Sequence, residues 1–503
     1  MNTPAGALAI HNSTKHGTPP AHPELLVRYL RLDPRNAPTA FKVYRSLPVS
    51  PLPRALVASV PSAVSVLSGR SGDPSPIDAG LVATLLFLAA GVTRTASGTG
   101  RRIFFRAAMS AGNLHPVEVY AVVGPGVDGI SAGVYHFAPR EFGLTPLRAG
   151  EFGFQLGVST PLALVLTGLV WRTAWKYGER SWRHLYWDAG CVLANLLSVA
   201  EAHGLDPRIL VGFDDQRVSR LVGIDGMDEM PLAVVALGPE KGVELGPPPD
   251  LSPVSPEVDP VAPHPFRLPL LVEAQNGSTL EAREVVPWRR AAVGVTSEAP
   301  VRVDPPPAAA QEGIEAVILR RGSTRVMLRE SVVSEALQWP MAAASRAVPM
   351  DAAPRGTLLE HYANVHAVEG FRPGAYRWGP GVPELVAALD SPREMSALLC
   401  LDQPLGGDSA YTVFHSAHLG PLIDLLGSRG YRAAQLEAGI VSGRLALCAF
   451  ALGLGATGLT FFDDLVSRFF ETTSAPMLVT SVGVPGTVPA PSGRPGEPAN
   501  LRR

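Results

Sequence analysis

The sequence predicts a mixed fold of helices and strands that is built twice from one module. The chain has 503 residues, too many for one ordinary domain and enough for two large ones. The segment KYGERSWR at 176–183 returns as LLGSRGYR at 425–432, so each shared arginine recurs 249 residues later. Two copies are too few for a solenoid. We therefore expect an internal pseudo-dimer, equivalent to a two-fold homodimer fused into one chain.

The elements of the first copy follow from its apolar patterning. Residues 1–50 are polar and interrupted by prolines, so we expect an arm that runs over the surface. Residues 77–92 have the composition of a buried helix with Asp78 as its N-cap. Residues 188–203 have helical periodicity and end at Gly204, a typical C′ residue. Short β-rich runs predict strands at 116–123, 133–137, 161–168 and 231–237.

The second copy repeats this order. A helix is expected at 332–344, and 374–378 and 476–483 correspond to two strands of the first copy. Between the copies the prolines crowd together, which predicts an extended connector. The expected boundaries are an N-terminal arm at 1–50, domain 1 at 51–240, a Pro-rich connector at 241–310, domain 2 at 311–490 and a C-terminal tail at 491–503.

Composition narrows the class of protein. The formal net charge is −2 and there is no long basic run, which disfavours nucleic acid as the main partner. No signal-peptide core is present near the start, and the longest apolar run, 81–92, is too short to span a bilayer. We expect a cytoplasmic protein without a membrane partner. The three cysteines form no CxxC and are expected to be buried thiols, and no ligand spacing suggests a metal.

Four segments carry side chains suited to chemistry. In the loop at 110–116, small residues allow close approach to a flat ligand, and Ser110 and Asn113 can bond its edge. The run RRGSTR at 320–325 matches an anion such as phosphate. The segment at 453–464 is rich in glycine but is not a dinucleotide fingerprint.

The fourth segment is the pair Lys176-Tyr177. A tyrosine beside a lysine ammonium can have its phenol pKa lowered and can then serve as a base. Each of the four segments also has a purely structural interpretation. These are a polar turn, a solvated basic turn, tight helix–strand packing, and a surface lysine beside a half-buried tyrosine.

Taken together, these motifs resemble those of the nitroreductase superfamily of FMN enzymes. Within that superfamily the chain resembles the SagB-type azoline dehydrogenases, which are the flavin subunits of thiazole/oxazole-modified peptide synthetases. The resemblance rests on SAGxxHP at 110–116, on KYGER at 176–180, on the Asp-Ala-Gly helix that starts at 188 and on GFDD at 212–215. The second half matches more loosely, through motifs such as RRGSTR at 320–325. It implies an α+β, nitroreductase-like fold present twice, with FMN between the two copies.

The resemblance also assigns residues to the flavin site. The residues implied for the cofactor are the phosphate group Arg321, Ser323 and Arg325, the segment near flavin N5 at Gly458, Leu459, Thr460 and Phe461, and the opposing loop Ser110, Ala111, Gly112 and Asn113. Each copy has kept a motif that the other lost, because residues 349–356 stand where the second copy would need the SAGN loop. One complete site is therefore expected, and the reciprocal site, beside Arg70-Ser71, should be empty or weak.

In this family Lys176 and Tyr177 would serve azoline oxidation. The Cα–H of an azoline is acidified by the adjacent imine and carbonyl, so Tyr177, polarised by Lys176, could remove that proton while hydride leaves Cβ for the flavin. The implied partners are an azoline-containing precursor peptide and a YcaO-type cyclodehydratase. Two alternatives stay open: a general FMN nitro or quinone reductase using NAD(P)H, and a flavin-free docking subunit. Further oligomerisation is also left open.

Overall fold

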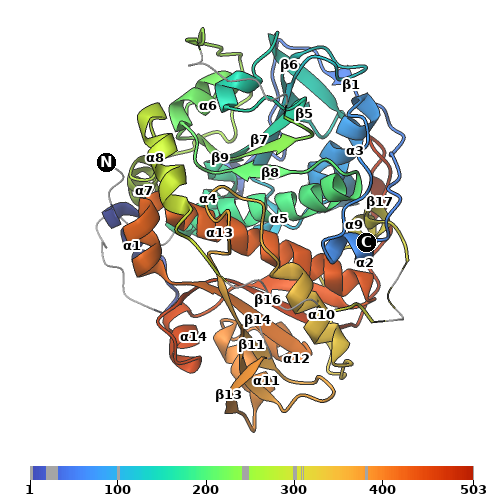
Figure 1. Ribbon diagram of the computed structural model, residues 1–503, viewed down its shortest axis with the longest axis vertical. Helices are drawn as coiled ribbons and strands as arrows, with labels where there is room; N and C mark the ends of the chain where they lie inside the picture. Colours follow the sequence, from blue (N-terminus) through green and yellow to red (C-terminus); the bar gives the residue numbers. More distant parts are fainter. Residues whose placement is uncertain are drawn as a thin grey trace.

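The molecule consists of two lobes packed on either side of a pair of long helices (Figure 1). The computed structural model describes residues 4–17, 32–98, 102–240, 249–297, 303–306, 309, 311–379 and 383–501. Helices α5 (Ser181–Ala202) and α13 (Leu419–Ala451) cross in the middle, and every side chain of α5 is buried. The principal hydrophobic core runs continuously through both lobes around these helices.

Each lobe contains one large sheet. The first has the order β1-β6-β5-β4-β7-β9-β8, and the second has the order β10-β16-β14-β11-β12-β13, with β15 also paired to β16. The first-lobe strands are β1 (Ser50–Pro51), β4 (Val117–Val123), β5 (Gly133–Ala138), β6 (Gly143–Ala149), β7 (Leu162–Leu169), β8 (Arg208–Leu210) and β9 (Glu229–Leu237). The second-lobe strands are β10 (Met327–Leu328), β11 (Glu360–Val365), β12 (Gly374–Trp378), β13 (Glu384–Ala388), β14 (Tyr411–Ala417), β15 (Gly455–Leu459) and β16 (Ala475–Pro485). Six strands follow one order in both lobes, since β6-β5-β4-β7-β9-β8 corresponds to β13-β12-β11-β14-β16-β15.

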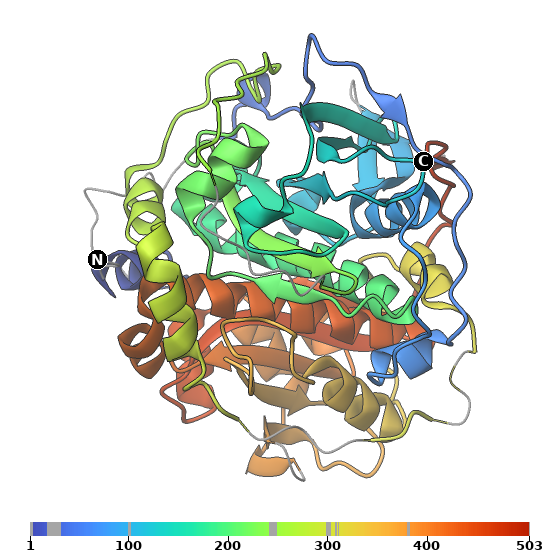
Figure 2. The same cartoon turned by 45° about the horizontal axis from the view of Figure 1, so that its top comes forward.

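Shorter helices surround the sheets and the central pair (Figure 2). They are α1 (Pro4–Ser13), α2 (Ala63–Leu67), α3 (Ala79–Ala90), α4 (Val170–Tyr177), α6 (Asp215–Val222), α7 (Pro269–Asn276), α8 (Ala282–Ala292), α9 (Ile314–Arg320), α10 (Glu335–Ala344), α11 (Pro392–Leu399), α12 (Pro404–Asp408) and α14 (Asp463–Phe469). A three-stranded sheet joins β2 (Val92–Ser97), β3 (Arg102–Arg106) and β17 (Ala499–Leu501). The C-terminal tail therefore pairs with a hairpin of the first lobe.

The apolar patterns predicted several of the regular elements at their observed places. The helix expected at 77–92 is α3, and the Asp78 carboxylate accepts a hydrogen bond of 2.8 Å from the Leu81 amide, as an N-cap should. The four expected strands of the first lobe are β4, β5, β7 and β9. The helix expected at 188–203 begins earlier, at Ser181, and Gly204 follows its end with φ +62°. The three cysteines are buried and free.

Two segments are more ordered than the prolines suggested. The arm at 1–50 contains α1, which packs on α7 and α13, and the connector at 241–310 contains α7 and α8. Pro269 stands in the first turn of α7, where proline fits because no helical hydrogen bond needs its missing N–H. Leu270 and Leu271 are fully buried, so apolar contact holds this helix in place. Parts of both segments, among them 18–31 and 241–248, lie outside the described residues.

The central helices touch at a pair of glycines. Gly190 of α5 and Gly439 of α13 face each other, 249 residues apart in sequence. A Cβ atom at Gly439 would lie 2.5 Å from the Trp187 carbonyl oxygen and 2.9 Å from the Gly190 Cα. The backbones can approach this closely because neither residue has a side chain.

Buried ion pairs join the lobes in both directions, because an arginine of each lobe bonds to an aspartate of the other. We call these the exchanged ion pairs. Arg183 of the first lobe donates to Asp463 of the second at 2.6 Å, and Arg429 of the second donates to Asp215 of the first at 2.7 Å. Burial alone would raise the pKa of the Asp463 carboxyl, but the neighbouring arginines outweigh burial and hold it well below its usual range. The two lobes are thus locked to each other by paired charges as well as by apolar packing.

Of the helices in the described part of the chain, none has both the length and the apolar composition to cross a membrane.

Candidate active site

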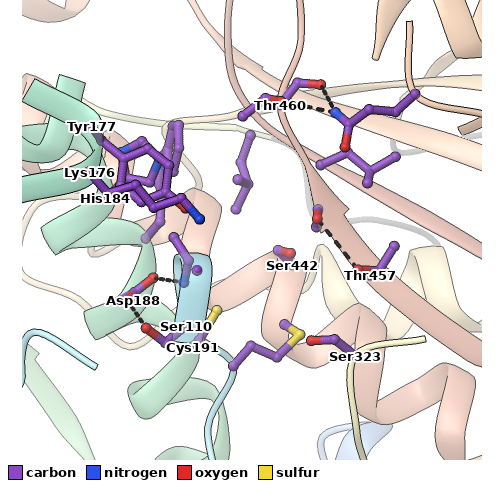
Figure 3. Close-up of a pocket in the computed structure, with 18 of the residues that line it drawn as sticks. Ser110, Lys176, Tyr177, His184, Asp188, Cys191, Ser323, Ser442, Thr457 and Thr460 are labelled. Carbon is purple, nitrogen blue, oxygen red and sulfur yellow. Dashed lines mark hydrogen bonds between the residues drawn. The ribbon is translucent and has the colours of Figure 1, made fainter. Parts of the chain in front are cut away.

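A cavity of about 410 Å³ lies between the lobes, against the central helices (Figure 3). Residues of both lobes line it. Those of the first lobe are Met109, Ser110, Ala111, Gly112, Lys176, Tyr177, His184, Trp187, Asp188 and Cys191. Those of the second lobe are Ser323, Arg325, Gln403, Ser442, Thr457, Gly458, Leu459, Thr460 and Leu478. The cavity is therefore a composite of segments that are far apart in sequence.

Lys176 and Tyr177 reach the cavity from the end of α4. Gly178, with φ +54°, interrupts the helical path between α4 and α5. Gly427, with φ +63°, interrupts α13 in the same way. The Tyr177 ring stacks on the His184 ring, with centroids 4.1 Å apart and planes inclined by 12°. Lys176 is exposed and Tyr177 is half-buried, so the pair lies at the open side of the cavity.

The loop that carries Ser110 meets this pair. Its Gly112 has φ +63°, and a Cβ atom there would lie 2.8 Å from the Tyr177 Oη and 3.1 Å from the Lys176 Nζ. The backbone conformation favours glycine here, and a Cβ atom would also force the ends of the two side chains to shift. Asn113 does not line the cavity, because its Nδ2 donates to the Phe104 carbonyl at 2.8 Å.

The second lobe contributes the side of the cavity for which the sequence predicted phosphate binding. Ser323 and Arg325 line the cavity, as do Gly458, Leu459 and Thr460.

Two other predicted residues lie behind the cavity wall. Arg321 is buried, its Nη2 donates to the Ala107 carbonyl at 2.6 Å, and its Nε has no hydrogen-bond partner among the described residues. Burial lowers the pKa of Arg321 to about 10. Phe461 is fully buried, beneath the guanidinium of Arg180.

Several lining residues were not predicted. His184, Trp187, Asp188 and Cys191 follow one another at the spacing of a single helix face, and this periodicity is the signal that could have found them. Gln403 was not foreseeable from a motif. Its Nε2 donates to the Thr460 Oγ1 at 2.9 Å and so fixes one wall of the cavity.

The electrostatics correct one expectation. Burial, together with the charge of Asp188, raises the pKa of Tyr177 to about 12, and Arg325 of the other lobe opposes this change. The expectation that Lys176 would lower this pKa is therefore wrong, because burial dominates and the opposing cation is Arg325. Burial also raises the pKa of Asp188 to about 7, although hydrogen bonds from Ser110 and Ala111 act in the opposite direction.

The duplication would place a second, reciprocal cavity beside β8. Segments of the protein itself occupy that place. There β8 takes the position of β15, and the segment 349–351 bonds along β8. The Ile209 amide donates to the Pro349 carbonyl at 2.7 Å, and the Asp351 carboxylate accepts from the Val211 amide at 2.7 Å. The Trp288 ring packs against Gly212 at the same place.

The counterpart of the Ser110 loop also needs a correction. The sequence placed it at 349–356, but Thr357 and Leu358 bond to Glu437 in the way that Ser110 and Ala111 bond to Asp188. The second copy is shorter between this loop and the strand that follows it, since Thr357 lies three residues before β11 and Ser110 lies seven residues before β4, so the sequence offset shifts here.

Known proteins match the chain in parts and as a whole. The model of the nitroreductase family matches residues 68–239. The trifolitoxin-processing protein TfxB of Rhizobium leguminosarum bv. trifolii is 33% identical over 29% of this chain and 43% of its own length. The microcin B17-processing protein McbC of Escherichia coli is 28% identical over 26% of this chain and 52% of its own length. The chain thus spans about half the length of these curated relatives.

A solved structure matches almost the entire chain. The putative nitroreductase from Anabaena variabilis is 25% identical, with a TM-score of 0.71, and the match covers 95% of this chain and 99% of that one. The two-lobed arrangement is therefore shared with another protein of this kind. The predicted family is confirmed for residues 68–239, which form a nitroreductase-family domain, and the whole chain shares its fold with a putative nitroreductase.

Proposed function

We propose that this protein is an FMN-dependent dehydrogenase that oxidises thiazolines or oxazolines to thiazoles or oxazoles in a ribosomally made peptide. The observation that carries the proposal is the position of Lys176 and Tyr177. Their Nζ and Oη atoms both lie about 3 Å from the position that a Cβ atom on Gly112 would occupy. Ser323 and Arg325 line the same cavity from the other lobe. Proton-handling side chains thus share one cavity with anion-binding ones.

The residues of the cavity fit FMN. Its volume of about 410 Å³ lies in the range of ligand sites. Ser323 and Arg325 would hold the phosphate, since a guanidinium matches phosphate oxygens and a hydroxyl can donate to them. The unpartnered Nε of buried Arg321 would add a donor behind them. Gly458 and Thr460 would lie along the ring system, opposite Ser110 and the loop that follows it.

We further propose that the chain arose by duplication and has kept one flavin site. A fused pseudo-dimer is supported by the common strand order, by the matching interruptions at Gly178 and Gly427, and by the exchanged ion pairs. The segment 349–351 and the Trp288 ring fill the reciprocal place, which supports one FMN per chain.

The proton step would fall to the Lys176–Tyr177 pair. An azoline must lose a proton from Cα and a hydride from Cβ, and the chemistry that FMN supplies when bound is acceptance of the two electrons. At rest Tyr177 is a phenol, because its pKa is about 12. Forming its phenolate at pH 7 would cost about 7 kcal/mol, and the resulting phenolate would be a strong base for the Cα proton. Lys176 would stabilise that charge.

Access and partners follow from the same site. Because Lys176 is exposed, the cavity opens where a peptide segment could enter. Two relatives are named as processing proteins, one of trifolitoxin and one of microcin B17, which supports a substrate of that kind. A YcaO-type cyclodehydratase that forms the azoline would then be the expected partner.

The test combines absorbance with mass spectrometry. The purified protein should be yellow, with one FMN per chain, and should remove two hydrogen atoms from a synthetic thiazoline-containing peptide. Lys176→Ala and Tyr177→Phe should keep FMN and lose most of this oxidation. Tyr135→Phe is the matched control, since Tyr135 is half-buried in β5, away from the cavity, and should leave the rate unchanged.

Three results would reject the proposal in different ways. Full activity of Tyr177→Phe would remove the tyrosine from the proton step. Brisk oxidation of NADPH with a nitroarene, without peptide oxidation, would favour a general FMN reductase. A colourless protein that retains no bound FMN after FMN has been added would favour a docking subunit. Two bound FMN per chain would contradict the single composite site.

A further inference from the structure

We propose that Asp188 is the positioning residue of this site. It holds the loop from Ser110 to Asn113 against Lys176 and Tyr177, and its charge controls how readily the pair exchanges a proton. The inference rests on the proposed function only in taking that pair as the acting one. Asp188 belongs to no motif with an assigned role, and it acts on the chemistry through its neighbours.

The Asp188 carboxylate closes the loop with two hydrogen bonds. Its Oδ2 accepts from the Ser110 hydroxyl at 2.5 Å and its Oδ1 accepts from the Ala111 amide at 3.0 Å. The Ser110 Oγ in turn accepts from the His115 amide at 2.8 Å, which fixes the far end of the loop. The next residue after this clamp is Gly112, the point of contact with Lys176 and Tyr177. Figure 3 shows the hydrogen bond between Ser110 and Asp188, and a shift of this clamp would shift the loop against the pair.

The other half contains the same clamp without the chemistry. Glu437, 249 residues after Asp188, accepts from the Thr357 hydroxyl and from the Leu358 amide. Leu425 and Leu426 stand there in place of the lysine and tyrosine. Both carboxyls therefore order a loop, but only Asp188 lies in the cavity. Glu437 provides a matched control for the structural part of the role.

The surroundings of Asp188 couple its charge to Tyr177. Among the described residues no cation forms an ion pair with Asp188, so burial raises its pKa to about 7, close to neutrality. When ionised, Asp188 raises the pKa of Tyr177. Loss of the charge should therefore lower that pKa and ease formation of the phenolate. The other titratable groups that line the same or the adjoining cavity are Lys176, His184, Cys191, Arg325, Arg106 and His115.

The experiment compares Asp188→Asn with Glu437→Gln in the FMN-loaded protein. The substrate is a synthetic thiazoline-containing peptide. Because ionised Asp188 opposes formation of the Tyr177 phenolate, kcat/KM of the wild-type protein should fall as the pH rises, with an inflection near pH 7. Asp188→Asn should remove this inflection and lower the maximum rate by about 10-fold to 100-fold through loop displacement. Glu437→Gln should keep both the inflection and the maximum rate.

A second readout needs neither flavin nor substrate. The infrared carbonyl band of protonated buried carboxyls should lose intensity as the pH rises through about 7, and Asp188→Asn and Glu437→Gln should each remove a separate part of it. Ser110→Ala removes a hydrogen bond that lowers the Asp188 pKa, so it should move the Asp188 part of the band to higher pH. This variant keeps the test available if Asp188→Asn fails to fold.

The two hypotheses fail in different ways. An equal loss of rate at every pH in Asp188→Asn, with the inflection retained, would leave Asp188 a merely structural residue and overturn the inference. An infrared band that is unchanged in both Asp188→Asn and Ser110→Ala would do the same. Absence of FMN or of peptide oxidation in the wild-type protein would instead reject the proposed function and leave the infrared result standing.

Discussion

Substituting Gly439 by alanine tests the crossing on which the molecule is built. A new Cβ atom would lie 2.5 Å from the Trp187 carbonyl oxygen, whereas a carbon and a carbonyl oxygen normally approach to about 3.3–3.6 Å. This oxygen and the next neighbour, the Gly190 Cα, are both helix backbone. The helices α5 and α13 must therefore move apart by about 1 Å. Such overpacking costs about 3 kcal/mol, and the better helix propensity of alanine returns about 1 kcal/mol. We expect the free energy of unfolding to fall by about 2 kcal/mol.

The assay is urea unfolding followed by circular dichroism, with Gly420→Ala as the matched control. Gly420 lies in the same helix, is exposed, and has no atom within 4 Å of a Cβ placed on it. That variant should be as stable as the wild-type protein or slightly more stable. If Gly439→Ala were equally stable, the close contact between the two central helices would be refuted. Gly190→Ala should repeat the loss, because Gly190 faces Gly439 across the crossing.

Two further predictions concern buried charges. Asp463→Asn leaves Arg180 and Arg183 buried without their counter-charge, so the free energy of unfolding should fall by about 3–5 kcal/mol in urea titrations. Glu437→Gln concerns pH. Burial raises the pKa of Glu437 to about 7 from its ordinary 4.5, and a raised carboxyl pKa stabilises the folded state at low pH and loses that contribution as the pH rises to the folded value. The wild-type protein should therefore lose up to about 3 kcal/mol relative to Glu437→Gln between about pH 4 and about pH 7.

Each of these predictions has its own control. Asp464, next to Asp463, is 38% exposed in its side chain and pairs with Lys15, so Asp464→Asn should cost less than about 1 kcal/mol. Equal losses in the two variants would mean that the exchanged ion pairs do not hold the lobes together. For Glu437, a stability difference that stays constant across the pH range would contradict the raised pKa.

Local sequence patterns predicted many of the helices and strands and part of the cavity lining. Apolar periodicity depends only on neighbouring residues, so it located α3, the four first-lobe strands β4, β5, β7 and β9, and the end of α5 just before Gly204. The constant spacing of 249 residues between the two arginine motifs predicted two related modules. The motifs also named about half of the cavity lining, because Ser110 to Gly112, Ser323 with Arg325, and Gly458 to Thr460 are local patterns of small and polar residues.

Tertiary structure decided what depends on contacts between distant segments. Proline content predicted an extended connector, but burial of Leu270 and Leu271 against the other helices makes α7. The filling of the reciprocal place by 349–351 depends on how that segment meets β8.

The proton-transfer pair of the proposed mechanism shows the same division most clearly. The adjacency of Lys176 and Tyr177 was visible in the chain, yet it suggested a lowered phenol pKa. Burial against α5 and the charge of Asp188 raise that pKa instead. Desolvation and the distance between charges are set by the folded surroundings, and no sequence neighbour reports them.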